Sequence, residues 1–168
     1  DSIRKTNVAA REHGGITQHI GAYQVEYKKR LITFIDTPGH EAFGKIRSRG
    51  AKAADIALLV VAANDSVKPQ TLESIKQIQA AGVSMIVVIN KIDLPGVIID
   101  KVKSDLAKAG VQVEGYGGDV PVALVSAKEG KGVDELLDLI LLVSDMKGLV
   151  GSKDGDVTSV VIEAKVDK

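Results

Sequence analysis

Aliphatic runs of strand length alternate with helical patterns through most of this chain. Residues 56–63 read Ile-Ala-Leu-Leu-Val-Val-Ala-Ala, and an unbroken apolar strand is typical of a sheet covered on both faces. Shorter runs occupy residues 85–89 and 122–125, and apolar residues at helical spacing follow each run. Strands that alternate with helices form largely parallel sheets. We therefore expect an α/β fold with a mostly parallel sheet and helices on both faces.

Three helices are expected between and after these strands. Pro69 suits the first position of a helix, because its missing N–H has no partner there, and Gly82 suits the stop. Apolar spacing predicts a second helix over residues 99–106 and a third, the most amphipathic, over residues 133–141. The first helix is expected to bury Leu72, Ile75 and Ile78.

Composition limits what the protein can bind. The formal net charge is +0, which gives no broad positive surface for DNA or an anionic membrane. Only 3% of residues are aromatic, which disfavours surfaces that stack bases. Cysteine is absent, so thiolate metal sites are excluded, and a cytoplasmic location fits this composition. No apolar run approaches the roughly 18 residues of a membrane span.

A predicted hairpin delivers a carboxylate to a strand end. Residues 22–27 and 31–35 form strand-like runs around a Lys-Lys-Arg turn, and the second run ends at Asp36. Thr37 and Pro38 then break the strand before Gly39. An aspartate and a free glycine N–H at a strand end suit a phosphate and its Mg²⁺, which prefers oxygen ligands. The alternative is an ordinary Pro-Gly turn after a strand, for which this sequence is also typical.

Two residues near this turn have the chemistry that phosphoryl transfer needs. His40 directly follows the turn, and an imidazole can orient a water molecule beside a γ-phosphate. Thr17 lies in a glycine-bounded loop, and its hydroxyl can coordinate Mg²⁺ when that loop closes over a γ-phosphate. Alone, each residue also fits an ordinary cap or loop position. His13 and His19 have no comparable surroundings.

Polar residues follow the strand at residues 85–89. Asp93 can accept both hydrogen-bond donors on one edge of guanine, a pattern that adenine does not present. Asn90 can bond the other edge of the base, and the stem of Lys91 can cover the ring face. A simple turn after a strand is the alternative for this short motif.

The next strand, at residues 122–125, is also followed by polar residues. Here the backbone N–H of Ala127, between Ser126 and Lys128, can donate to the carbonyl of a base. This segment alone also fits a turn into a helix. Guanine recognition is favoured because the two segments follow neighbouring strands and so meet at one edge of the sheet.

Together these segments resemble the G domain of translational GTPases. The resemblance rests on residues 15–19 (Gly-Ile-Thr-Gln-His), on residues 36–43 (Asp-Thr-Pro-Gly-His-Glu-Ala-Phe), and on the segments at 90–93 and 126–128. Within that class, GGITQHIGAY and DTPGHEAF are most similar to the bacterial translation initiation factor 2 family. The similarity covers nearly the whole chain.

The resemblance implies a domain division and a role for each site residue. Residues 1–150 would be a partial G domain, and residues 151–168 a linker and the first strand of a following β-barrel domain. Thr17 and Asp36 would sit at Mg²⁺, the second through water, and His40 would position the attacking water. The residues that would bind GTP or GDP are Thr17, Asp36, Gly39, Asn90, Lys91, Asp93, Ser126, Ala127 and Lys128.

The resemblance also implies a cytoplasmic translation initiation factor that hydrolyses GTP on the ribosome. The full-length protein would contact both ribosomal subunits and initiator tRNA, without binding a membrane or DNA directly. Two alternatives stay open: a pseudo-GTPase that serves as a binding module, and another ribosomal GTPase such as an elongation factor.

The phosphate loop of that family is missing from these 168 residues. Its first strand and GxxxxGK[ST] loop are expected before Asp1, whereas Gly-Lys occurs only at Gly44-Lys45 and Gly130-Lys131, without a following Ser or Thr. Such a loop holds the phosphates with backbone N–H groups and a lysine. We therefore interpret the chain as truncated and expect weak GTP binding and almost no activity of the chain alone. The missing strand would lie in the middle of the sheet. Without it, we expect either a gap between the flanking strands or flanking strands that close up against each other.

Overall fold

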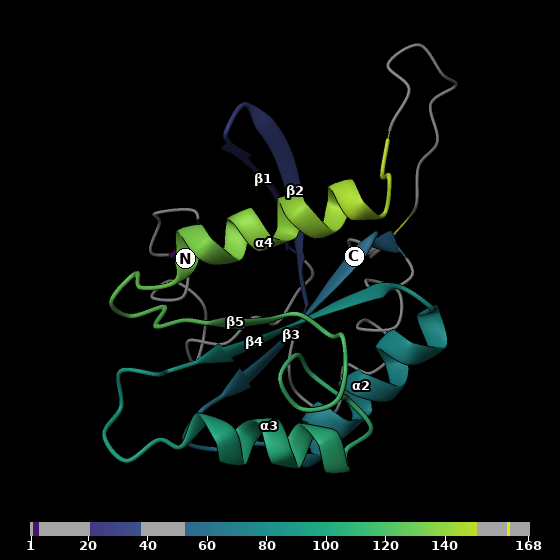
Figure 1. The fold of residues 1–168 in the computed structure, drawn as a ribbon. Coiled ribbons are helices and arrows are strands. Elements are labelled where there is room, and N and C mark those ends of the chain that lie inside the picture. Colours follow the sequence, from purple (N-terminus) through teal and green to yellow (C-terminus); the bar gives the residue numbers. More distant parts are fainter. Residues whose placement is uncertain (1, 4–20, 38–52, 151–160, 162–168) are drawn as a thin grey trace, which may run out of the picture.

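The computed structural model describes residues 2–3, 21–37, 53–150 and 161, and Figure 1 shows how their elements are arranged. The described strands form two sheets, a β1–β2 hairpin and a three-stranded sheet in the order β3-β4-β5. The strands are β1 Gly21–Tyr27, β2 Arg30–Asp36, β3 Ile56–Ala62, β4 Ser84–Asn90 and β5 Val122–Leu124, and the helices are α2 Pro69–Ala81, α3 Ile99–Lys108 and α4 Val133–Met146.

The three-stranded sheet is parallel throughout, as the alternation of strands and helices predicts. Strand β4 lies in the middle, with β3 on one edge and β5 on the other. Its central side chains are buried: Ile86, Val87 and Ile89 are 0% exposed. A strand this apolar is stable only when helices cover both of its faces.

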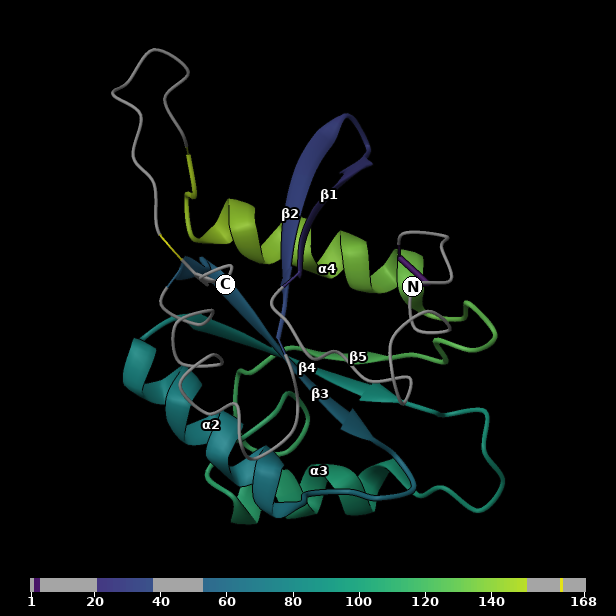
Figure 2. The ribbon, with the colours of Figure 1, turned by 180° about the vertical axis from the view of Figure 1, so that it is seen from behind.

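Helices cover both faces of this sheet, which confirms the predicted layers. Helices α2 and α3 lie on one face and α4 on the other (Figures 1 and 2). The first core is formed between β3, β4, α2 and α3, and includes Val61, Ile75 and Leu106. The second lies under α4, where Leu136 and Ile140 pack with the opposite face of β4.

The three predicted helices are confirmed: each begins at the predicted residue, and α3 and α4 extend to Lys108 and Met146, beyond the predicted spans. Pro69 begins α2, and Gly82 ends it in the left-handed conformation with φ of 68°. Leu72 is 42% exposed, so its prediction as a buried residue is wrong; Ile75 and Ile78 alone form the buried stripe of α2. Leu72 lies in the first turn of α2.

The hairpin forms around a two-residue turn and rests on α4. Lys28 and Lys29 have φ of 48° and 62°, the pair of positive angles that a type I′ turn requires. The hairpin is joined to α4 by ion pairs of Lys28 with Asp138 and of Arg30 with Asp145 at 2.7 Å. These pairs are solvent-exposed, so each contributes little to stability.

Strands β2 and β3 do not pair with each other, and a gap separates the two sheets. Two arrangements are expected if the central strand is missing, an open gap or a closed-up sheet. The structure has the gap. The gap also explains a difference from prediction: Val60 in the aliphatic strand β3 is 59% exposed, although its sequence predicts cover on both faces.

Several expectations fall outside the described residues. These are the glycine-bounded loop that holds Thr17, and the linker and most of the strand expected after residue 150. Within the described part of the chain, no helix has the length and apolar character to cross a membrane.

Replacing Lys29 with glycine should stabilise the hairpin. A side chain at a left-handed position is strained, and Gly removes that strain without removing the ion pair of Lys28. We expect Lys29→Gly to raise the free energy of unfolding by about 0.5–1 kcal/mol in chemical denaturation. Lys29→Ala keeps the Cβ atom and should give no such gain, so equal stability of the two variants would contradict a left-handed turn.

Candidate functional site

The carboxyl ends of β4 and β5 bring two polar loops together. Asn90 is the last residue of β4, and the loop after β5 begins at Val125. The Val125 N–H donates to the Ile89 carbonyl at 2.9 Å, and the Ile92 N–H donates back to the Val125 carbonyl at 3.3 Å. The parallel pairing therefore continues past the strands and fixes one loop against the other.

The Asn90 side chain links the two loops. Its Oδ1 accepts the backbone N–H of Lys91 at 2.7 Å and that of Ala127 at 3.0 Å. Lys91 has φ of 64°, a left-handed conformation that turns the chain sharply after the strand. Because the protein occupies its carbonyl oxygen, the NH₂ group of Asn90 is the part of the amide that can serve a ligand.

A second side-chain bond joins the same loops. The Ser126 Oγ donates to Asp93 Oδ1 at 2.7 Å and accepts the Glu129 N–H at 3.2 Å, and Ser126 is 0% exposed. This hydrogen bond is the largest cause that lowers the pKa of Asp93 below 3.8, while burial acts in the opposite direction. Asp93 is therefore a carboxylate at neutral pH, able only to accept hydrogen bonds.

Nearby lysines add to the effect on Asp93. The positive charges of Lys128 and Lys131 also lower its pKa, by less than the Ser126 hydrogen bond does. Lys91 and Lys128 are exposed beside the two loops, where their stems are free to lie along a planar ligand.

The loop after β5 is closed by contacts that the sequence does not signal. Ser126 and Lys131 exchange backbone hydrogen bonds of 2.9 and 3.1 Å across the loop. Gly132 then has φ of 74°, and a Cβ atom there would lie 2.0 Å from the Leu124 carbonyl oxygen. Only glycine fits at that position. At the other side of the loop, the Ser2 hydroxyl donates to the carbonyl of Ala127.

One predicted contact takes a different form in the structure. The Ala127 N–H is expected to donate to a base carbonyl, but here it donates to Asn90 Oδ1. A base carbonyl would share or replace that bond. The contact with a base stays a prediction. In the structure, Asn90 Oδ1 is the acceptor with which a base carbonyl would compete for the Ala127 N–H.

The other predicted site residues lie elsewhere or outside the described part. Asp36 is the last residue of β2, in the other sheet, and it lines the gap between the sheets. Thr17, Gly39 and His40 lie outside the described residues. Among the described residues, no group of three or more His, Cys, Asp or Glu side chains is arranged to hold a metal ion. The residues that the structure brings together are Asn90, Lys91, Asp93, Ser126, Ala127 and Lys128.

The fold and these loops identify the class of protein. Residues 3–145 match the family described as "Elongation factor Tu GTP binding domain". That match covers most of the chain, and the chain belongs to this family: it is the G domain of a translational GTPase.

Its curated relatives are initiation factors. The chain is 56% identical over all 168 residues to translation initiation factor IF-2 of Chloroflexus aurantiacus, and 57% identical to that of Acinetobacter baylyi. It spans 23% of the length of the first relative and 19% of the second.

Solved structures of translation factors have the same fold. The elongation factor SelB of Methanococcus maripaludis, in complex with the GTP analogue GppNHp, has a TM-score of 0.65 and 30% identity, over 77% of this chain and 28% of that chain. GDP-bound aIF5B of Aeropyrum pernix has a TM-score of 0.64 and 28% identity, over 87% of this chain and 33% of that chain. Both confirm the predicted fold class of P-loop GTPases.

Removing the Ser126 hydroxyl should raise the pKa of Asp93. In Ser126→Ala the main cause of the lowered pKa is lost, so the carboxyl should titrate closer to its ordinary value in an NMR titration. Loss of a buried hydroxyl should also cost about 1–2 kcal/mol of stability.

The sign of the pH effect follows from the direction of this shift. Folding lowers the pKa of Asp93, so the ionised carboxylate stabilises the folded state at pH above its pKa in the unfolded chain. This stabilisation is lost as the pH falls through its pKa in the folded chain. Ser126→Ala should therefore lose less stability on acidification than the parent chain. Ser74→Ala, which removes a hydroxyl that donates to the Gln70 carbonyl, should leave the pKa of Asp93 unchanged; an equal shift there would contradict the assignment.

Proposed function

We propose that this chain is the G domain of a translation initiation factor that binds GTP and hydrolyses it on the ribosome during initiation. The observation that carries the proposal is the pair of side-chain bonds, Asn90 to Ala127 and Ser126 to Asp93, that hold two loops at one sheet edge. Identity of 56% to factors named IF-2 favours initiation over elongation.

Guanine fits the chemistry of this edge. Asp93 is an ionised acceptor, which suits the two donors on one edge of the base, and adenine lacks that pair. The Asn90 NH₂ group suits the other edge. Lys91 and Lys128 are exposed on either side, so their aliphatic stems can cover the two faces of the ring.

The phosphate side of the site belongs to the residues around β2. Asp36 presents an oxygen donor at the end of that strand, which is the chemistry that Mg²⁺ prefers, so it would hold the ion through water. Thr17 would be a second ligand, Gly39 would donate its N–H to the γ-phosphate, and His40 would orient the attacking water. Bound Mg²⁺ would neutralise charge on the phosphate oxygens.

The ribosome is the proposed partner, with both subunits and initiator tRNA contacted through the full-length protein in the cytoplasm. We also propose that the G domain ends near residue 150 and that residues 151–168 lead into a β-barrel domain. No direct contact with DNA or a membrane is proposed.

Guanine recognition can be tested on the chain itself, separately from phosphate binding. We expect GMP at millimolar concentration to shift the amide signals of Lys91, Ala127 and Lys128 in NMR spectra, and AMP to leave them in place. Asp93→Asn replaces one acceptor with a donor, so GMP binding should fall at least about tenfold while xanthosine monophosphate gains. Asp119→Asn, an acidic residue outside the site, is the matched control.

GTP binding by these 168 residues should stay weak. No GxxxxGK[ST] sequence occurs in them, so backbone N–H groups and a lysine for the phosphates are not supplied. We expect a dissociation constant for GTP weaker than about 1 µM by calorimetry. A tighter value would overturn the view that phosphate binding depends on that motif.

The catalytic proposal requires the longer protein and ribosomes. His40→Ala should lower ribosome-stimulated GTP hydrolysis by about 10²–10⁴-fold with nucleotide affinity retained, because only the water loses its orientation. His19→Ala is the comparison variant and should keep most of the activity. Loss of activity in both variants, or in neither, would count against the role assigned to His40.

A further inference from the structure

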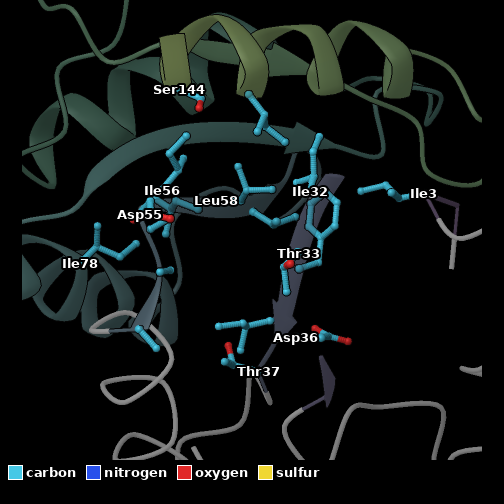
Figure 3. Close-up of a pocket in the computed structure, with 18 of the residues that line it drawn as sticks. Ile3, Ile32, Thr33, Asp36, Thr37, Asp55, Ile56, Leu58, Ile78 and Ser144 are labelled. Atoms are coloured by element: carbon cyan, nitrogen blue, oxygen red, sulfur yellow. The ribbon is translucent and has the colours of Figure 1, made fainter. Parts of the chain in front are cut away.

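Ser2 is far from the guanine site in the sequence and beside it in the structure. Its hydroxyl donates to the backbone carbonyl of Ala127, 125 positions further along the chain. The next residue, Ile3, packs against the apolar cluster under α4, and Figure 3 shows it below α4 together with Ile32 of β2. This partly buried isoleucine therefore holds the serine next to the loop after β5.

The backbone of Ala127 is held from two sides. Its N–H donates to Asn90 Oδ1 at 3.0 Å, and its carbonyl accepts the Ser2 hydroxyl. A base carbonyl that binds the Ala127 N–H would compete with Asn90 for it. The bond from Ser2 is made by the carbonyl, so a bound base would leave it intact and residue 127 would stay in place.

The same bond sets the direction of the next N–H group. The peptide unit between Ala127 and Lys128 is planar and trans, so its N–H points opposite to its carbonyl. Because the carbonyl faces Ser2, the Lys128 N–H points away from Ser2. It has no acceptor in the described part of the chain and is open to a ligand. A carbonyl that accepts a hydrogen bond also polarises the N–H of its own peptide unit into a better donor.

We propose that Ser2 is a positioning residue for recognition of the guanine carbonyl O6, because it fixes the backbone of Ala127 and Lys128 so that both N–H groups can donate to that oxygen. This inference rests on the proposed function, since it concerns the same base. A carbonyl oxygen has two lone pairs and can accept both donors. Adenine has an amino group at that position, so two fixed N–H groups would oppose it. Ser2 would thus add specificity at an atom that Asp93 does not contact.

Other contacts of the loop do not replace this one. The bonds of Ser126 with Asp93 and with the Glu129 N–H restrain the residues on either side of the peptide unit 127–128. Both residues of that unit are exposed, so packing adds little restraint there. Loss of the Ser2 hydroxyl should therefore loosen this one peptide unit and leave Asp93 in place.

The test measures the affinity of the longer protein that contains this chain for GDP and for 6-thio-GDP. The second nucleotide keeps both donors for Asp93 and has sulfur, a poor acceptor, in place of O6. We expect Ser2→Ala to weaken GDP binding by about three- to tenfold, the effect of one hydrogen bond, and 6-thio-GDP binding by less than about twofold. Ser2→Thr retains a hydroxyl and should bind GDP as the parent does.

A second readout reports the bond itself in the absence of nucleotide. In the chain of 168 residues, Ser2→Ala should move the NMR signals of the Ala127 carbonyl carbon and of the Lys128 amide. Ser74→Ala is the matched control, because it also removes a hydroxyl that donates to a backbone carbonyl, within α2 and away from the site. It should change neither these signals nor the affinity for GDP. An Ala127 signal that does not move in Ser2→Ala would contradict the bond.

The outcomes separate this inference from the proposed function. Equal losses for GDP and 6-thio-GDP in Ser2→Ala would show a general loosening of the site and would overturn the role at O6. Unchanged GDP affinity in Ser2→Ala, or the same loss in Ser2→Thr, would also overturn the inference while the proposed function stands. Failure of the parent protein to bind GDP would instead overturn the proposed function, and this inference with it.

Discussion

The position of β4 in the middle of the parallel sheet is the constraint on which the rest of the described structure depends. Its side chains from Ile86 to Ile89 are buried, because β3 and β5 pair with its edges and helices cover its faces. Its parallel pairing with β5 ends at Ile89 and Leu124, so its last residue, Asn90, lies beside the loop after β5. The site is thus a consequence of the pairing.

The bonds at that edge make the site rigid before any ligand arrives. Asn90 and Ser126 each bond across to the other loop, and the bond from Ser126 also lowers the pKa of Asp93. A carboxylate held in position and charged loses little freedom when it accepts hydrogen bonds from a base. The same bonds limit the Ala127 N–H, which a base would have to share with Asn90.

Most of the fold could be predicted from the sequence, because local signals and tertiary structure agree. Pro69 and Gly82 bound α2, and the aliphatic runs form the parallel strands. The site segments at Asn90 and Ser126 could be paired because parallel strands share one edge. The requirement for glycine at position 132 and the exposure of Leu72 could not be predicted, since both depend on how distant segments approach. The sequence left open whether β2 and β3 would separate or close up, because that also depends on how distant segments approach.

A structure of the longer protein with bound GDP tests guanine recognition most directly. The account predicts that the Asp93 carboxylate lies about 2.7–3.2 Å from both N1 and the exocyclic nitrogen of guanine, with the Ala127 N–H turned toward O6. Nucleotide bound with its base away from Asp93, or with Ser126 and Asp93 separated, would contradict it.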